Sequence, residues 1–351
     1  MSDSPYTSIV LTGTPEGEIL ALWNDFFANA VLPTHYVSPD FFCDPFAGHG
    51  RRFAVLVSIG DRVDAVATGT ENGTAIRCGL GVRPQAVFRK NVDLAAVGAV
   101  LAGALKQGCL TADLIDLHSW GPLDGLRSSG FAHKAASEGD RVIMLDLSKG
   151  PEQLFKEFSE RRRTDLRKTM KSGDLVVKEL ETEAELADIY DLHCGWTTRK
   201  GVVADPFESF RSVLGSKYRK TFIAIHDGKV IAATFLRFCP GAVVEYAANN
   251  SLDGFQKLRP NELLGWRAIE WACSAGFTHF SLGASHPFLA RFGGNVIASH
   301  RYRLDRTVLK VHVNRERLQN FARQASLSLP DGIRNRIKAA RAGGLLTANR
   351  R

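Results

Sequence analysis

The stretch LRPNELLGWRAIEWACSAGFTHFSLGAS, from Leu258 to Ser285, predicts a loop, a helix, a short connection and a strand. Apolar residues recur at helical spacing along its middle, and Gly276 then supplies the C-terminal cap that glycine forms best. The head of such a helix carries unpaired backbone N–H groups that favour anions. The loop before the helix is therefore a candidate site for a phosphate-bearing donor.

The same order of elements occurs earlier in the chain. Residues 102–120 align with residues 269–286, and each stretch has a helix closed by glycine followed by a strand that opens with threonine, at Thr111 and Thr278. A three-stranded antiparallel meander precedes each stretch, over residues 52–79 and 221–250. We therefore expect a duplicated α/β (α+β) architecture, with domains at residues 1–147 and 148–313 and a basic helical tail at 314–351.

The remaining elements follow from hydrophobic periodicity. Helices are expected over residues 16–31, 92–108, 122–131, 151–173, 183–201 and 206–217. Strands are expected over residues 6–11, 111–120, 141–147 and 174–181, and residues 299–313 have further β character.

Composition narrows the class of protein. The six cysteines show no C-x-x-C spacing, which argues against a zinc site or a disulfide framework and favours buried reduced thiols. The N-terminus lacks the pattern of a secretory signal, and the longest apolar stretch, residues 94–105, is too short to span a bilayer. We expect a cytoplasmic protein. Serine-hydrolase, NTPase and dinucleotide motifs are absent from the sequence.

The net charge of +8 is concentrated in two regions. Residues 314–351 hold nine basic and two acidic residues, and residues 160–171 hold six basic and two acidic ones. The second run could contact donor phosphates, tRNA or a glycolipid diphosphate, or be a solvated helix face. The tail also carries apolar residues at Leu318, Phe321, Ala322, Ile333 and Ile337, so it could dock onto its own protein or onto an anionic membrane surface at the inner face.

The element order of each half resembles the GNAT acyltransferase fold. Two tandem units resemble the Fem-type (FemAB) aminoacyltransferases and the CelD-like acyltransferases of polysaccharide loci. The motifs that carry this are SERRRTDLRKTMKSG at 159–173, TTRKG at 197–201, RPNELLGWRAIEWACSAG at 259–276 and FSLGAS at 280–285. The resemblance implies transfer of a group from an activated acyl donor without a covalent enzyme intermediate. It also implies acyl-CoA as co-substrate, with no tightly bound cofactor and no metal.

GNAT proteins hold the coenzyme A pyrophosphate between the fourth strand and the following helix. The matching segment here is QKLRPNE, residues 256–262, but the usual glycines are missing, and Pro260 has no N–H to donate. Phosphate contact would then rest on the side chains of Lys257 and Arg259, which could equally belong to a solvated loop, and Asn261 is expected to be the N-cap of the helix. The resemblance implies cofactor contacts at Gln256, Lys257, Leu258, Arg259 and Asn261.

The candidate catalytic residues are Glu245, Tyr246 and His286. Glu245 and Tyr246 lie on alternating faces of an apolar strand, where a carboxylate needs either a partner or a raised pKa. A raised pKa would suit a general base, whereas the alternative is a carboxylate paired with an arginine. His286 could transfer protons or be a loop residue. The candidate acceptor-binding residues are Arg163, Arg167, Arg199, Asn249, Ser285 and Arg291.

Three functions remain open from the sequence. The first is transfer of an acyl group from acyl-CoA to an amine or hydroxyl of a cell-envelope or exopolysaccharide precursor. The second keeps the fold and uses aminoacyl-tRNA as donor and a peptidoglycan precursor as acceptor, although residues 152–173 are too short for the long helical hairpin of several Fem-type enzymes. The third is an inactive scaffold in polysaccharide biosynthesis.

Overall fold

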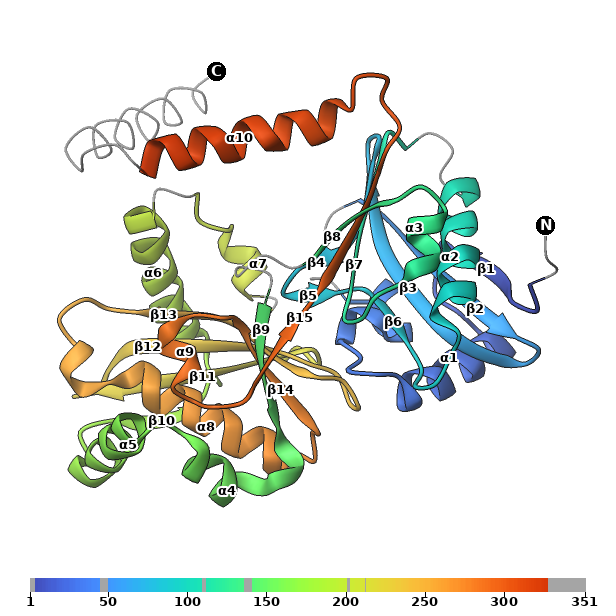
Figure 1. The fold of residues 1–351 in the computed structure, drawn as a ribbon. Coiled ribbons are helices and arrows are strands. Elements are labelled where there is room, and N and C mark those ends of the chain that lie inside the picture. Colours follow the sequence, from blue (N-terminus) through green and yellow to red (C-terminus); the bar gives the residue numbers. More distant parts are fainter. Residues whose placement is uncertain are drawn as a thin grey trace.

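The computed structural model describes residues 4–44, 50–108, 112–135, 141–200, 203–211 and 213–327. Within these ranges the chain forms two sheets that lie side by side, each with helices against its faces (Figure 1). The expected architecture, two α/β units with mixed sheets flanked by helices, is confirmed.

The first sheet has the strand order β1-β2-β3-β4-β7-β16-β8, with β5 and β6 paired beside this path. Its strands are β1 (Thr7–Leu11), β2 (Arg51–Ile59), β3 (Arg62–Asn72), β4 (Ala75–Leu80), β5 (Arg83–Pro84), β6 (Ala86–Phe88), β7 (Leu114–Ser119), β8 (Ala132–Ala135) and β16 (His300–Asp305). Its helices are α1 (Gly17–Asn29), α2 (Leu94–Gly108) and α3 (Asp124–Ser128), with 3-10 turns η1 (His35–Val37) and η2 (Pro39–Phe42).

The second sheet has the order β10-β11-β12-β13-β14-β9-β15. Its strands are β9 (Arg141–Asp146), β10 (Val176–Glu179), β11 (Arg219–His226), β12 (Lys229–Arg237), β13 (Val244–Ser251), β14 (His279–Ala284) and β15 (Asn295–Ala298). Its helices are α4 (Gly150–Glu157), α5 (Glu160–Ser172), α6 (Glu183–Lys200), α7 (Phe207–Arg211), α8 (Pro260–Ser274) and α9 (Pro287–Ala290), with 3-10 turns η4 (Leu147–Lys149) and η5 (Gln256–Leu258). Helix α10 (Val311–Leu327) follows β16.

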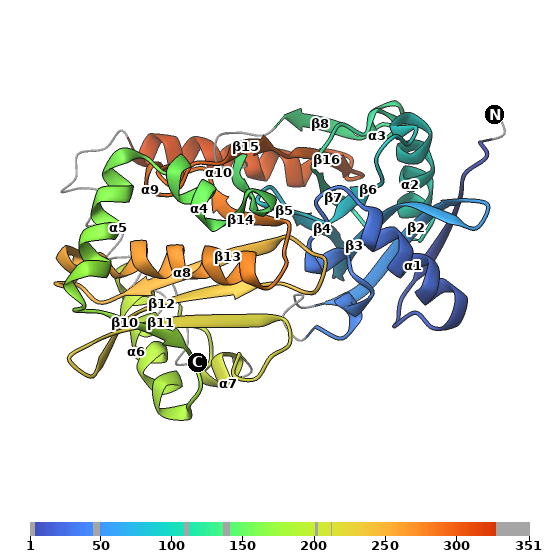
Figure 2. The same cartoon turned by 90° about the horizontal axis from the view of Figure 1, so that it is seen from below.

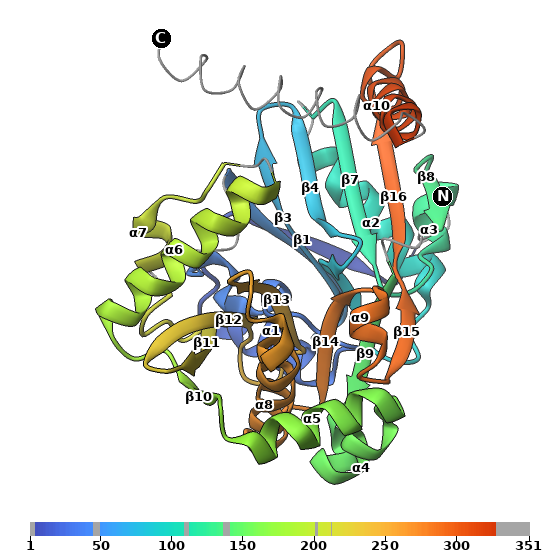
Figure 3. The ribbon, with the colours of Figure 1, turned by 90° about the vertical axis from the view of Figure 1, so that its left-hand side faces the viewer.

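The two sheets exchange strands. The sequence predicts that the strand at 141–147 completes the first unit, whereas β9 pairs with β14 in the second sheet. In return, β16 comes from the second half of the chain and pairs with β7 in the first sheet. Figure 3 shows β15 and β16 almost in line, one in each sheet. The boundaries expected at 147/148 and 313/314 stay predictions, but a cut at 147/148 would remove a strand from each sheet.

Apolar side chains of both faces of the first sheet are buried. In β2, Val55 and Val57 pack with α2, while Ala54 and Leu56 pack with α1 on the opposite face, as alternation along a strand requires. The cluster that contains Ala54 continues into the second sheet through Met144 of β9, and it also includes Tyr218 and Val243 from the second half of the chain. We call this cluster the interdomain core. It joins the two halves through buried apolar surface rather than through a polar contact alone.

Two expected elements differ from the structure. The helix expected over 151–173 is broken into α4 and α5, because Phe158 is extended and the side chain of Ser159 caps α5 by accepting a hydrogen bond from the N–H of Arg162. The β character expected to residue 313 ends at β16, and α10 begins at Val311. There the hydroxyl of Thr307 accepts a hydrogen bond from the N–H of Val311 at 2.7 Å, which satisfies an orphan donor of the first turn.

Two further features bear on the class of protein. Cys78 and Cys239 are buried, as expected, whereas Cys43 is exposed, and Cys109 lies outside the described residues. Among the helices that the structure describes, none combines the length and apolar character needed to cross a bilayer.

Candidate active site

The parallel strands β13 and β14 separate soon after they meet. Only Val244 with Phe280 and Glu245 with Ser281 are paired, although β13 continues to Ser251. Gly283 has a φ of +81°, a conformation that favours glycine, and the pairing of β14 with β9 is irregular at this point. The bend in β14 leaves the backbone groups on that side of β13 without a ladder partner. Figure 2 shows α8 lying across the sheet beside these strands.

A bulge brings Tyr246 and Asn249 onto the same face of β13. The register with β12 shifts between Phe235 and Leu236, so residues three apart point the same way instead of alternating. The side-chain amide of Asn249 donates to the hydroxyls of Tyr246 and Thr234, at 2.9 Å in both cases. Burial raises the pKa of the Tyr246 hydroxyl, and the hydrogen bonds from Thr234 and Asn249 offset this only in part. Tyr246 therefore stays protonated at neutral pH and can donate a proton.

The end of β13 meets the head of α8. The side-chain amide of Asn261 lies 3.4 Å from the hydroxyl of Ser251, the last residue of β13. The prediction that Asn261 caps the helix is wrong, because α8 begins at Pro260, and the cap position belongs to Arg259 in a left-handed conformation, with φ 57°. The N–H groups of Asn261 and Glu262 thus fall in the first helical turn, where intrahelical acceptors are lacking.

The two candidate phosphate-binding cations differ. Lys257 is exposed, whereas Arg259 forms an ion pair with Asp165 of α5. Gln256 and Leu258 lie in η5 with Lys257, and the side-chain oxygen of Gln256 accepts a hydrogen bond from the N–H of Gly254 at 2.9 Å. Arg259 therefore holds α5 against α8, and Lys257 is the cation of this loop that remains available to a ligand.

Arg162 is the residue of this region that sequence reasoning missed. Its side chain is only 2% exposed, and its guanidinium carbon lies 4.4 and 4.3 Å from the ring centres of Phe288 and Phe292. It pairs with Glu262 at 3.2 Å and donates to the carbonyl of Phe288 at 2.7 Å. Burial raises the pKa of Tyr246, and the positive charge of Arg162 offsets a part of that rise, so Arg162 lies within electrostatic reach of the Tyr246 hydroxyl.

The sequence contains a signal for the burial of Arg162. Arg162, Leu166 and Thr169 are four and three residues apart, which places them on one helical face, and all three are buried. Of the remaining cations of the run, Arg163 is half-buried, and Arg161, Arg167, Lys168 and Lys171 are exposed on the other faces of α5.

The other candidate acceptor-binding arginines have local partners. Arg163 donates to the carbonyls of Lys156 and Phe158, which satisfies the C-terminal end of α4. Arg167 lies over the ring of Phe155 at 5.4 Å. Arg199 pairs with Asp253 at 3.4 Å and donates to the carbonyl of Ser251 at 3.0 Å, so it touches the end of β13.

The segment after β14 is exposed. The ring of His286 accepts a hydrogen bond from the N–H of Phe288 at 3.2 Å and so caps α9. The N–H of Ser285 donates to the carbonyl of Arg141 in β9 at 2.7 Å. Arg291 is exposed, and its carbonyl accepts from the N–H of Ser159 at 3.0 Å. The roles predicted for His286, Ser285 and Arg291 stay predictions.

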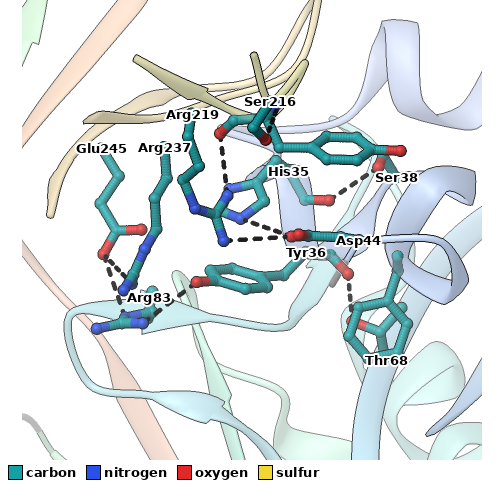
Figure 4. Close-up of polar contacts among 12 residues, drawn as sticks. His35, Tyr36, Ser38, Asp44, Thr68, Arg83, Ser216, Arg219, Arg237 and Glu245 are labelled. Carbon is teal, nitrogen blue, oxygen red and sulfur yellow. Dashed lines mark hydrogen bonds and ion pairs between the residues drawn. The ribbon is translucent and has the colours of Figure 1, made fainter. Parts of the chain in front are cut away.

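Glu245 precedes Tyr246 in β13 and so lies on the opposite face of the strand. Its carboxylate points into a buried polar cluster between the two halves (Figure 4). Its carboxylate lies 3.1 Å from Arg83 and 3.6 Å from Arg237. Burial raises the pKa of Glu245, but the positive charges around it, led by Arg83 and Arg237, outweigh burial and leave the pKa lowered. The arrangement matches the arginine-paired alternative, and a general base with a raised pKa has no support in this geometry.

The same cluster includes a second carboxylate. Asp44 lies 3.5 Å from both His35 and Arg219, and all three side chains are buried. Because His35, Asp44 and Arg83 come from the first half and Arg219, Arg237 and Glu245 from the second, we call these six residues the interdomain ion cluster. It lies beside the interdomain core and fixes the two halves relative to each other.

Residues 156–300 match the sequence model of an acetyltransferase (GNAT) domain. The chain is similar in structure to FemX, at 15% identity and a TM-score of 0.64, with 85% of this chain and 98% of that one covered. It is similar to a tandem GNAT protein from the clavulanic acid biosynthesis pathway, at 13% identity and a TM-score of 0.52, with 86% and 99% covered. It also resembles L-PGS from Bacillus licheniformis, at 11% identity and a TM-score of 0.52, with 86% and 96% covered.

A search of curated proteins found no match. At such low identities the structural likeness shows the fold alone, which is a tandem GNAT fold of the Fem-like kind. The expectation drawn from the sequence motifs is thereby confirmed at the level of the fold and of the GNAT domain.

Proposed function

We propose, from the premise that this chain is a GNAT-type acyltransferase with its GNAT domain at residues 156–300, that its donor is an acyl-CoA and its acceptor an amine or hydroxyl of a cell-envelope or exopolysaccharide precursor. The observation that carries this proposal is the gap between β13 and β14. Tyr246 lies near its start, and Asn261, at the head of α8, lies at its far end beside Ser251.

The dimensions of the gap suit an extended donor. From Tyr246 to Ser251 the strand advances about 17 Å, at roughly 3.3 Å per residue. A thioester at one end of an arm of that length would lie beside Tyr246, while its phosphates would meet Lys257 and the N–H groups of Asn261 and Glu262. Arg259 contributes less, because Asp165 already balances its charge.

The chemistry then needs one polarising group and one proton donor. Backbone N–H groups of β13 that lack a partner on the β14 side hydrogen-bond the thioester oxygen as it becomes negative. The acceptor attacks the carbonyl carbon, the C–S bond breaks, and the Tyr246 hydroxyl protonates the leaving thiolate. Water takes the proton of the acceptor and restores the Tyr246 hydroxyl, because Glu245 lies on the other face of β13.

A panel of acyl-CoA donors with detection of the released thiol tests this proposal. The Tyr246→Phe variant keeps the ring and removes the proton donor, and we expect kcat to fall by about 10²-fold. Tyr190→Phe is the matched control, because that hydroxyl donates to the carbonyl of Asp205 at an exposed position. Equal activity of the two variants would remove Tyr246 from the mechanism.

The second candidate donor is aminoacyl-tRNA. The observations that favour it are the likeness to FemX and the exposed cations of α5, Arg161, Lys168 and Lys171, next to the head of α8. This alternative predicts affinity for tRNA that falls steeply with salt concentration. Thiol release from no acyl-CoA, with release of amino acid from charged tRNA, would favour it. Turnover of neither donor would leave the scaffold interpretation.

We also propose that the protein is cytoplasmic and associates with an anionic membrane surface through α10 and the basic tail. Leu318 and Phe321 are 70% and 72% exposed on α10, and Arg315 and Arg317 lie between Val311 and Leu318. Exposed apolar side chains beside cations are typical of interfacial helices. Residues 328–351, which include Ile333 and Ile337, lie outside the described residues. Co-sedimentation with anionic but not with neutral vesicles, reduced in Phe321→Ser, is the expected result.

A further inference from the structure

A second region of the molecule has the features of a binding site. A cavity of about 390 Å³ lies between the first sheet and α10, away from β13 and β14. In β7, Ile115 and Leu117 pack into the core against α2, so Asp116 points to the opposite face, toward the cavity. Figure 3 shows α10 beside the end of β16. The charged residues of the cavity wall are Arg77, Asp116, Arg301, Arg303, Arg315 and Glu316.

The charges form a row across three neighbouring strands. Asp116 of β7 is paired in register with Arg77 of β4 on one side and with Arg303 of β16 on the other. Arg301 also contacts Asp116, with 2.5 Å between its terminal nitrogen and the carboxylate, and it reaches Glu316 of α10 at 2.8 Å. Arg303 pairs with the same two carboxylates. Two guanidinium groups and two carboxylates therefore neutralise each other and attach α10 to the sheet.

The cavity wall holds two more guanidinium groups than carboxylates. Among the described residues, neither Arg77 nor Arg315 forms an ion pair, and both are exposed. Attaching α10 does not require them, because Arg301 and Arg303 already do this. Guanidinium groups bind phosphate through parallel N–H donors, and a volume of this size lies in the range of small-molecule sites. The excess charge thus gives the cavity the chemistry of a phosphate site.

The cavity continues into an apolar groove along α10. This groove is shallow, with a volume of about 550 Å³, and it is formed by one face of α10 and the turn before it, at Leu309, Val311, Leu318 and Ala322; it shares Arg315 and Gln319 with the first cavity. A ligand with a phosphate beside an apolar chain would fill both at once. We propose that the charged cavity binds the phosphate of a phosphate-bearing amphiphile, whose chain lies in the groove along α10.

Calorimetric titration of the full chain tests this proposal without requiring turnover, so its outcome is independent of the proposed acyl transfer. The probe is dihexanoyl-phosphatidylglycerol below its micelle concentration, and inorganic phosphate is the second ligand. We expect the amphiphile to bind and the double variant Arg77→Gln, Arg315→Gln to weaken binding by about tenfold or more. Arg127→Gln is the control, because it removes one exposed charge of the first half, on α3, outside the cavity wall.

Each outcome of the titration either identifies the class of ligand or contradicts the proposed site. If Leu318→Ser weakens binding of the amphiphile but not of inorganic phosphate, the groove is supported as the site of the amphiphile's apolar chain. Binding of inorganic phosphate as tightly as the amphiphile, lost in the double variant, would support a phosphate site that serves soluble compounds. Binding of neither probe, or equal binding by the double variant and by Arg127→Gln, would overturn the proposal.

Discussion

Replacing Glu245 by glutamine removes one negative charge from a buried site that holds two guanidinium groups. Removing one partner of a buried ion pair costs about 3–5 kcal/mol, because the remaining charge is left without compensation. The glutamine oxygen can still accept a hydrogen bond, and Arg83 keeps its contact with the hydroxyl of Tyr36. We therefore expect the lower end of this range, about 3 kcal/mol of unfolding free energy.

Urea denaturation followed by tryptophan fluorescence measures this loss. Glu181→Gln is the control, because Glu181 is 66% exposed in its pair with Lys178, and exposed pairs contribute about 0–1 kcal/mol. An unchanged unfolding free energy in Glu245→Gln, with acyl transfer reduced by about 10²–10⁴-fold, would refute the structural role and restore Glu245 as a general base.

The stabilisation that Glu245 provides depends on pH, and the direction of that dependence follows from its pKa. The pKa of Glu245 is lower in the folded state than in the unfolded chain, so the unfolded state binds the proton more readily. The stabilisation is complete above the unfolded value of about 4.3 and is lost as the pH falls from there through the folded pKa. Wild type should therefore lose stability in acid more steeply than Glu245→Gln.

Two further predictions concern buried basic side chains. Arg162→Lys cannot keep both the contact with Glu262 and the donation to the carbonyl of Phe288, so it should destabilise the protein by about 2–4 kcal/mol, whereas the exposed Arg161→Lys should change little in the same urea titration. Burial lowers the pKa of His35, so stability should fall as the pH drops below about 6.5, and His35→Gln should flatten this dependence; an equal pH slope in both proteins would contradict it.

Local structure was largely predictable from the sequence. The meanders, α6 and α8 follow from alternation, helical spacing and turn residues such as Asp227 and Gly228, all of which act between near neighbours in the chain. The exchange of β9 and β16 could not be predicted, because the sequence of a strand carries no local mark of the sheet that it joins. The burial of Arg162 was masked by exposed cations around it, although its helical face was readable.

The candidate site was predictable in part. The structure places Tyr246 and Asn249 in hydrogen-bond contact, and the head of α8 lies at the other end of β13 beside Ser251, but the bulge that aligns Tyr246 with Asn249 leaves no sequence signal. The roles of Glu245 and Arg259 depended on Arg83 and Asp165, and Arg83 comes from the other half of the chain. Partners that far apart in sequence are set by the tertiary fold, so residue types alone could not select between the alternatives.

The exchanged strands also determine when the first sheet can be completed during translation. The edge of β7 is completed only by β16, which leaves the ribosome about 180 residues later, or roughly 10–40 s at ~5–20 residues per second. Until then the first half exposes the hydrogen-bonding edge of an apolar strand, which can pair with other nascent chains. We therefore expect the yield of correctly folded protein to depend on chaperone supply, and we expect slower translation to increase that dependence.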